Sequence, residues 1–468
     1  MKVHETLPIV PIARGEGAWL VDFEGNRYLD AVSSWWVNLF GHSDVRIKDA
    51  IRAQLDDLPH AMLAGFTHRP IVELSERLHA LTGLGHAFYG SDGASATEIA
   101  LKMSFHYWRN RGYADKRSFV SLAGGYHGET MGALAVTDLA IFRDVYAPLL
   151  ASNVCMPSPI DGVDAAAAAL DAHLAQHHAT TAALIVEPLV QGAAGMRMYD
   201  PRYLALAREI TARHGVHLVV DEIMTGFGRT GSMFAWEQSG APRPDLMCLS
   251  KGITGGHLPL SCVLASDDVY GAFYDDDVTR GFLHSHSYTG NPLACAAAVA
   301  VLDIFRDDDV IARNRARAAE WASALRTVAA HERVRDFRQC GMIFAWEVAS
   351  DRPDFARWCF AQALAGGVLL RPIGNTVYVM PPYIVTGEEM THVAACVKIA
   401  CGCPDSRTTT DTPDSGMPAS AKARATPPGS VACAPAHAIH NSATAPLGLM
   451  RGPGCPSCTP RRASSPPP

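Results

Sequence analysis

An acid and an amine stand directly after two apolar stretches of the sequence. Residues 216–220 form an apolar run that ends at Asp221, and residues 246–249 form a second run that ends at Ser250 and Lys251. Short runs of this kind, rich in β-branched residues, predict buried strands. Ligands of open α/β sheets bind at the carboxyl ends of the strands, so we expect Asp221 and Lys251 to face one crevice.

This pair of residues suits chemistry on pyridoxal 5′-phosphate (PLP). A lysine amine bonds to the aldehyde of this cofactor, and a carboxylate keeps its pyridine nitrogen protonated, so that the ring accepts electrons. Glycines that follow the lysine, at 252, 255 and 256, would let a flat ligand approach the backbone closely. Either residue alone is more often structural, as a strand-end aspartate or a surface lysine. Together, with GFGRTG at 226–231 between them, they favour the cofactor.

The stretches DEIMTGFGRTG (221–231) and LSKGITGG (249–256) resemble the core of the class III, fold-type I PLP aminotransferases. The resemblance implies that Asp221 faces the ring nitrogen and that Lys251 holds PLP and later moves a proton. It also implies an α/β fold, with a large, mostly parallel sheet domain and a small α+β domain. We expect the large domain at 41–300 and the small domain at 1–40 and 301–400.

A turn rich in glycine and serine, residues 90–95, runs into a helical stretch. The free N–H groups and the positive dipole end of a helix start favour an anion. Taken alone, such a turn is more often an ordinary capped helix start. The resemblance implies that this turn binds the PLP phosphate through Gly93 and Ala94, with the backbone N–H as the only donor at Ala94.

Two further segments carry candidate residues. In GGYHG (124–128), a ring between glycines can stack on a flat ligand, and the resemblance gives Tyr126 contacts with the PLP ring and the substrate. In the class, the loop at 284–291 crosses a homodimer whose active sites lie at the interface, and it binds the partner's PLP phosphate. This implies cofactor contacts for His286 and Ser287 and a substrate contact for Ser285. The loop also caps the next helix, which does not exclude these contacts.

Three motifs, SSWW (33–36), GMRMY (195–199) and RPIGN (371–375), together resemble one subfamily, the adenosylmethionine-8-amino-7-oxononanoate aminotransferases of biotin biosynthesis. That resemblance implies S-adenosylmethionine as amino donor, 7,8-diaminononanoate as product and ping-pong kinetics. It also implies that Trp35 lines the substrate pocket and that Arg371 binds the carboxylate of the amino acceptor. Arg229 is a second basic candidate, for which structural pairing is equally compatible.

Two other interpretations stay open. An ω-amino acid:pyruvate or ornithine-type aminotransferase would share Asp221 and Lys251 but has no reason to carry the three motifs together. An inactive product is the second alternative, because both ends of the sequence depart from the family pattern. Residues 401–468 are rich in proline and contain no Phe, Trp or Tyr, and we expect them to be disordered.

Composition limits the other possibilities. The chain of 468 residues is long enough for about two domains, and its net charge of −7 gives no case for nucleic-acid binding. No apolar run approaches the length of a membrane span, and no secretory signal is visible, so we expect a cytoplasmic enzyme acting on small molecules. The 12 cysteines are scattered without paired spacing, and we expect no metal site.

Overall fold

The computed structural model describes residue 7 and residues 9–402, all within one compact unit of the chain. The expected disordered tail lies outside the described residues, apart from Cys401 and Gly402, which follow the last helix. No helix in the described part of the chain is both long enough and apolar enough to cross a bilayer.

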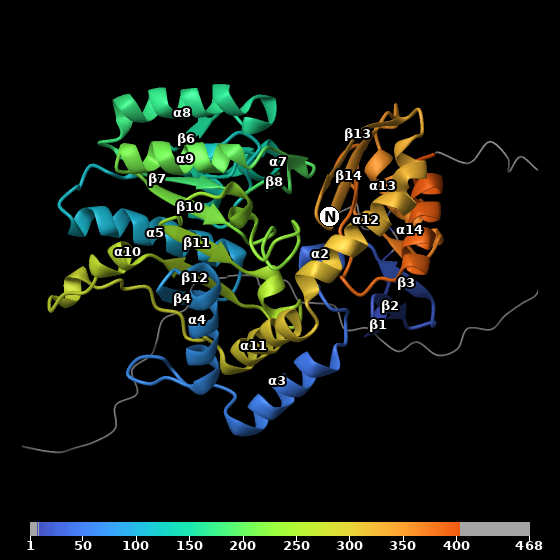
Figure 1. The fold of residues 1–468 in the computed structure, drawn as a ribbon, viewed down its shortest axis with the longest axis horizontal. Coiled ribbons are helices and arrows are strands. Elements are labelled where there is room, and N and C mark those ends of the chain that lie inside the picture. Colours follow the sequence, from blue (N-terminus) through green and yellow to red (C-terminus); the bar gives the residue numbers. More distant parts are fainter. Residues whose placement is uncertain (1–6, 8, 403–468) are drawn as a thin grey trace, which may run out of the picture. The chain divides into compact units, whose positions relative to one another are not determined.

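A seven-stranded sheet forms the centre of the fold, in the order β4-β12-β11-β10-β7-β5-β6 (Figure 1). Only β12 runs antiparallel to its neighbours β11 and β4, so the carboxyl ends of the other strands lie at one edge. This confirms the predicted large, mostly parallel sheet. The strands are β4 (His86–Gly90), β5 (Ser118–Leu122), β6 (Val154–Met156), β7 (Thr181–Val186), β10 (His217–Asp221), β11 (Leu246–Leu249) and β12 (Ser261–Ala265).

Helices follow most of these strands. The longer ones are α3 (Val45–Asp57), α4 (Arg69–Thr82), α5 (Gly93–Asn110), α8 (Val163–His177), α9 (Arg202–Arg213), α11 (Pro292–Asp307), α12 (Val310–Ala329), α13 (Phe355–Ala365) and α14 (Gly387–Ala400). Short helices and turns are α2 (Ser33–Trp36), α6 (Met131–Ala135), α7 (Ala140–Arg143), α10 (Asp267–Gly271), η1 (Asp144–Leu149), η2 (Pro159–Asp161), η3 (Ala235–Ser239), η4 (Lys251–Thr254) and η5 (Val278–Arg280).

Both faces of the large sheet are covered, which explains why its strands read as continuous apolar runs. Successive side chains of a strand point to opposite faces. In β7, Leu184 and Val186 therefore join the core that includes α8 and α9, whereas Ala183 and Ile185 pack with α5 on the other face. This two-sided burial fixes the edge of the sheet at which the strand-end residues emerge.

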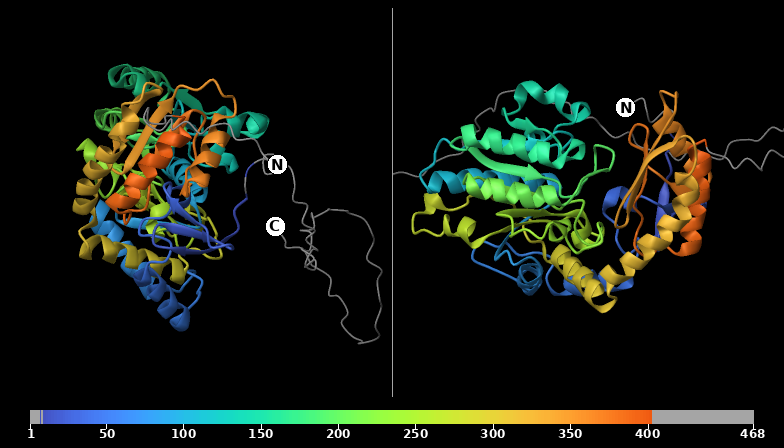
Figure 2. Two further views of the ribbon diagram at one scale, coloured as in Figure 1. Left: turned by 90° about the vertical axis from the view of Figure 1, so that its right-hand side faces the viewer. Right: turned by 45° about the horizontal axis from the view of Figure 1, so that its top comes forward.

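Two smaller sheets contain residues from both ends of the described chain. One has the order β1-β2-β3-β15, which joins strands from the start and the end of the described chain, and the other has the order β13-β14-β16. In both views of Figure 2 the first strands (blue) and the last helices (orange to red) lie together. The hairpin predicted at residues 16–30 is confirmed by β2 and β3, and β15 pairs with β3 in parallel. The division into domains at residues 40, 300 and 400 stays a prediction. The strands are β1 (Ile12–Glu16), β2 (Trp19–Asp22), β3 (Arg27–Asp30), β13 (Val334–Cys340), β14 (Ile343–Val348), β15 (Val368–Leu369) and β16 (Thr376–Val379), with β8 (Val190–Gln191) and β9 (Arg197–Met198) as a separate pair.

Candidate active site

A cavity of about 300 Å³ opens at the edge of the large sheet where the carboxyl ends of the parallel strands meet. Asp221 ends β10, and Lys251 follows β11 by two residues, so both come from neighbouring strands. The lining comprises Trp36, Asp92, Gly93, Ala94, Tyr126, His127, Gly128, Glu129, Glu187, Asp221, Ile223, Met224 and Lys251. Five residues predicted for the site, Gly93, Ala94, Tyr126, Asp221 and Lys251, therefore lie around one space.

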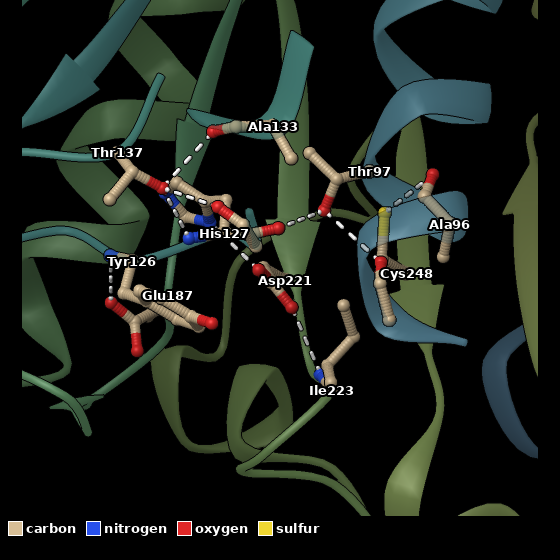
Figure 3. Close-up of polar contacts among 12 residues, drawn as sticks. Ala96, Thr97, Tyr126, His127, Ala133, Thr137, Glu187, Asp221, Ile223 and Cys248 are labelled. Carbon is tan, nitrogen blue, oxygen red and sulfur yellow. Dashed lines mark hydrogen bonds and ion pairs between the residues drawn. The ribbon is translucent and has the colours of Figure 1, made fainter. Parts of the chain in front are cut away.

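Asp221 is held by contacts on both of its oxygens (Figure 3). Nδ1 of His127 lies 2.7 Å from Oδ2, and the backbone N–H of Ile223 donates to Oδ1 over 3.1 Å. Only 4 % of Asp221 and 3 % of His127 is exposed to solvent. A carboxylate oxygen can accept two hydrogen bonds, so Asp221 keeps acceptor capacity for a donor in the cavity. A buried charge of this kind, fixed in direction, suits a protonated ring nitrogen.

Lys251 lies opposite an aromatic wall. Its Nζ is 5.2 Å from the centroid of the Trp36 ring. Burial lowers the pKa of the Lys251 amine, while the carboxylates of Asp221 and Glu187 act in the opposite direction. A lowered pKa increases the neutral fraction of an amine, and the neutral form is the nucleophile that attacks a carbonyl carbon.

Glu187, which follows β7, fixes two loops at the cavity. Its Oε2 accepts from the backbone N–H of Tyr126 over 2.9 Å, and its Oε1 accepts from that of Gly192 over 3.0 Å. The hydroxyl of Tyr126 in turn donates to Glu129 Oε1 over 2.9 Å. Burial raises the pKa of the Tyr126 hydroxyl, assisted by Glu129. The phenol therefore stays protonated and serves as a hydrogen-bond donor.

The start of α5 offers backbone N–H groups to an anion. Asp92 caps this helix by accepting from the backbone N–H of Ser95 over 2.9 Å, which leaves the N–H groups of Gly93 and Ala94 without partners inside the helix. Gly128 packs so closely that a Cβ there would lie 2.6 Å from the Cβ of Ala94. Its φ of +123° also favours glycine. The 124–128 loop can therefore lie directly against the helix start.

The lining residues fit PLP in chemistry as well as in space. An amine, a buried carboxylate and a helix N-terminus surround one cavity, and these are the groups that the aldehyde, the ring nitrogen and the phosphate require. Tyr126 and Trp36 supply aromatic surface beside them. In the described part of the chain, no group of three or more metal-ligating side chains is assembled.

The SSWW motif forms a left-handed turn, α2. All of its residues have positive φ angles, from 45° to 75°, and backbone hydrogen bonds run from Trp36 to Val32 and from Val37 to Ser33. This conformation costs roughly 1–2 kcal/mol per L-residue, so four such residues cost roughly 4–8 kcal/mol. Strain of that size persists only when tertiary contacts hold the segment, and it clusters at functional sites.

The turn separates the two tryptophans. Trp36 is 5 % exposed and lines the cavity, whereas Trp35 is 61 % exposed and lies outside the lining. Trp35 instead lies against Arg371, whose Cζ is 5.2 Å from the centroid of the indole ring. Trp35 and Arg371, each predicted to contact the substrate, thus lie against one another, whereas the tryptophan at the wall of this cavity is Trp36, for which no role was predicted.

Ser285, His286 and Ser287 are not among the residues that line this cavity. Their loop is fixed by its neighbours instead: Lys102 Nζ lies 2.9 Å from His284 Nδ1, and the Thr289 hydroxyl donates to the carbonyl of Tyr89 over 2.7 Å. The contacts predicted for these three residues, with a partner's cofactor and with substrate, stay predictions.

His127 and Arg229 have structural contacts that the sequence did not reveal. No role was predicted for His127, which contacts Asp221. Its position next to Tyr126, a predicted site residue, was the one sequence signal that it could lie near Asp221. Arg229 is 1 % exposed and donates to the carbonyls of Pro381, Trp36 and Asn38. Its guanidinium therefore holds backbone segments together and does not point into the cavity lining.

Glu187 makes stability depend on pH. Burial raises the pKa of its carboxyl from an ordinary 4.5 to about 7. A raised pKa stabilises the fold fully below the ordinary value, and this contribution, about 3 kcal/mol, is lost as the pH rises through about 7. We expect Glu187→Gln, which is neutral at every pH, to reduce the loss of unfolding free energy between about pH 5 and about pH 8, measured by urea denaturation.

Glu222→Gln is the matched control for this prediction. Glu222 has a pKa raised to about 7 for the same reason, but it lies outside the cavity lining and accepts from Thr225, Ala235 and Trp236. Each variant should remove its own share of the pH dependence. If the unfolding free energy of Glu187→Gln changed with pH as it does in the wild type, the Glu187 carboxyl would titrate alike in the folded and unfolded chains.

Comparison with known proteins gives one consistent result. Residues 1–400 match the model of the aminotransferase class-III family. The chain is 45 % identical over 406 residues to adenosylmethionine-8-amino-7-oxononanoate aminotransferase of Helicobacter pylori, covering 84 % of this chain and 92 % of that protein. Its counterpart from Geobacter sulfurreducens is 39 % identical over 415 residues, covering 83 % of this chain and 91 % of that protein.

Solved structures agree with this result. The crystal structure of adenosylmethionine-8-amino-7-oxononanoate aminotransferase from Methanocaldococcus jannaschii superposes with a TM-score of 0.83 at 34 % identity, covering 86 % of this chain and 95 % of that one. An amine transaminase from an uncultivated Pseudomonas species, solved with PLP bound, gives a TM-score of 0.78 at 32 % identity, covering 84 % of this chain and 95 % of that one.

Proposed function

The chain belongs to the class-III aminotransferase family, and we propose that it moves an amino group from S-adenosylmethionine to 8-amino-7-oxononanoate, giving 7,8-diaminononanoate for biotin biosynthesis. It is a PLP-dependent transaminase with the fold-type I architecture of its structural neighbours. The observation that supports this most is that Asp221, Lys251 and the start of α5 surround one cavity. The motifs SSWW, GMRMY and RPIGN support the choice of substrates.

When bound, PLP supplies an electron-accepting ring that stabilises negative charge on a substrate carbon. The protein's part is to hold that ring and to control protons. Asp221, oriented by His127 and the Ile223 N–H, would hold the proton on the ring nitrogen. Lys251 Nζ takes the proton from the substrate carbon that bears the amino group, acting as general base in the cavity. Trp36, whose ring centroid lies 5.2 Å from this amine, and Tyr126 line the same cavity.

Arg371 is the proposed site for the acceptor's carboxylate. The guanidinium lies against Trp35, and no carboxylate among residues 9–402 forms an ion pair with it. Burial raises the pKa of the Tyr378 hydroxyl, and the nearby charge of Arg371 opposes this rise. The same hydroxyl accepts a hydrogen bond from Nε1 of Trp36 over 3.0 Å. The two tryptophans, Tyr378 and Arg371 thus form one connected group between the cavity and the surface.

The test of the proposed function is a donor and acceptor screen on the purified protein. S-adenosylmethionine and 8-amino-7-oxononanoate should give turnover, with parallel lines in double-reciprocal plots as ping-pong kinetics require. Pyruvate paired with an ω-amino acid should give much less. Faster turnover with pyruvate would favour the amine and ω-transaminases, which are also structural neighbours.

We expect Arg371→Ala to raise the KM for 8-amino-7-oxononanoate about 10- to 100-fold, because hydrogen bonds to charged groups are worth roughly 1.5–3 kcal/mol. The half reaction with S-adenosylmethionine alone, followed by the PLP absorbance, should change much less. Arg371→Lys is the matched control, because it keeps the charge but cannot form two parallel hydrogen bonds with a carboxylate. Its KM should lie between those of the wild type and Arg371→Ala. Equal loss in both half reactions would contradict this role.

We also propose a homodimer in the cytoplasm. Ser285, His286 and Ser287 lie outside the lining of their own cavity, as expected if they serve the partner's cofactor. Exposed apolar side chains on and near the same loop, Leu283, Tyr288, Phe66 and Met62, offer surface for a partner. Analytical ultracentrifugation tests the dimer. Ser287→Ala should weaken PLP retention in dialysis without dissociating the protein, and a monomeric active enzyme would contradict the proposal.

A further inference from the structure

Asp30 lies beneath the left-handed turn α2 and is not part of the cavity lining. It is the last residue of β3 and is 0 % exposed. Its Oδ1 accepts from the backbone N–H of Val32 over 3.2 Å, and its Oδ2 accepts from the hydroxyl of Ser34 over 2.8 Å. Nε2 of His42 lies 3.1 Å from the same Oδ2. One carboxylate therefore contacts the residues before and inside the turn.

Two residues of the turn, Ser33 and Trp36, are fixed by groups other than Asp30. The Ser33 hydroxyl donates to the carbonyl of Met380 over 2.8 Å, and Trp36 Nε1 donates to the Tyr378 hydroxyl over 3.0 Å. The ring of Trp36 lies against Gly192, where a Cβ would approach the indole to 3.4 Å. The Ser33 and Trp36 contacts reach partners 347 and 342 residues away in the sequence, whereas Asp30 supplies the acceptors next to the turn, for the Val32 N–H and the Ser34 hydroxyl.

We propose that Asp30 is a positioning residue for substrate binding: its carboxylate holds the Ser33–Trp36 turn in the left-handed conformation, so that Trp36 walls the cavity beside Lys251 and Trp35 supports Arg371. Without the carboxylate, the two hydrogen bonds that offset the cost of the positive φ angles are lost. The L-residues of the turn would then return to the right-handed or extended regions. That change would rotate both indoles away from their places. The inference rests on the proposed function only for the identity of the substrates.

The first test measures the tryptophans themselves. Hydroxyl-radical footprinting of the holoenzyme, read by mass spectrometry, reports the exposure of each indole separately. In Asp30→Ala we expect oxidation of Trp36 to rise at least about threefold, while Trp321 and Trp346, both 0 % exposed in the core, stay protected. This measurement needs no substrate, so it decides the positioning role even if the proposed substrates are wrong.

The second test is kinetic. The KM of Asp30→Ala for 8-amino-7-oxononanoate should rise about tenfold, because the side chains of Trp35 and Trp36 no longer contact the substrate site. Its kcat should fall less than about threefold, because the amine of Lys251 is retained. Asp30→Asn keeps an acceptor for the Val32 N–H and should show a smaller effect. Ser34→Ala removes one hydroxyl only, and it serves as the second variant if Asp30→Ala does not fold.

Glycine provides a check on the strain itself. Gly adopts positive φ readily, so Ser34→Gly removes part of the conformational demand that Asp30 meets. In the Ser34→Gly background, the change Asp30→Ala should raise the KM by less than half the factor seen in the Ser34→Ala background, which lacks the same hydroxyl but keeps the conformational demand of an L-residue. An equal factor in both backgrounds, or a folded Asp30→Ala with unchanged Trp36 oxidation and unchanged KM, would overturn the proposal. So would unchanged oxidation in both Asp30→Asn and Ser34→Ala.

Discussion

Lys251→Ala is expected to abolish transamination, with turnover falling by at least about 10⁴-fold, equivalent to roughly 5.5 kcal/mol of transition-state stabilisation. The amine is the proposed nucleophile for the cofactor aldehyde and the proposed proton carrier, so one substitution would remove two functions. Among the described residues, the cavity lining contains no second lysine that could replace Lys251. The absorbance spectrum of the purified variant should also lack the band of covalently held PLP.

A second substitution separates charge from covalent chemistry. Lys251→Arg keeps a cation near the carboxylates of Asp221 and Glu187 but offers no nucleophilic amine, because a guanidinium stays protonated. It should be as inactive as Lys251→Ala while being closer to the wild type in stability. Substantial turnover in either variant would remove Lys251 from the mechanism, and partial activity confined to Lys251→Arg would indicate an electrostatic role alone.

Asp221→Asn is expected to bind PLP but to lose about 10³-fold or more in kcat, roughly 4 kcal/mol. The amide can still accept from the Ile223 N–H, so the local fold should persist. A neutral group lacks the negative charge that keeps the pyridine nitrogen protonated, and the ring then accepts electrons poorly. PLP content by absorbance and kcat by product assay measure the two expectations separately.

His127→Gln is the matched comparison, because His127 contacts Asp221 across 2.7 Å from the side of the 124–128 loop. It orients the carboxylate but does not carry the charge, so its kcat should fall by a smaller factor than that of Asp221→Asn. A fall of less than about tenfold in Asp221→Asn, roughly 1.4 kcal/mol, would make Asp221 structural. A larger loss in His127→Gln than in Asp221→Asn would assign the main role to the histidine.

The sequence determined the large sheet and its strand ends. Residues 181–186, 217–221 and 246–249 are mostly apolar and buried on both faces, as is typical of strands in a parallel sheet covered on both sides. Once the strands are parallel, their carboxyl ends meet at one edge, so the positions of Asp221 and Lys251 follow from local pattern alone. The glycine-rich start of α5 was predictable for the same reason, since helix starts have a local signature.

Only the tertiary structure decided how the substrate side of the cavity is built. No local preference favours a left-handed turn of Ser33, Ser34, Trp35 and Trp36, and the turn is held by partners as far away in sequence as Tyr378 and Met380, 342 and 347 residues from the groups they bind. That turn decides that Trp36 enters the cavity and that Trp35 meets Arg371. The pairing of His127 with Asp221 likewise joins residues 94 apart. Local patterns specify an element and where it ends, whereas the direction of a side chain in a strained segment is set by contacts that exist only after the chain has folded.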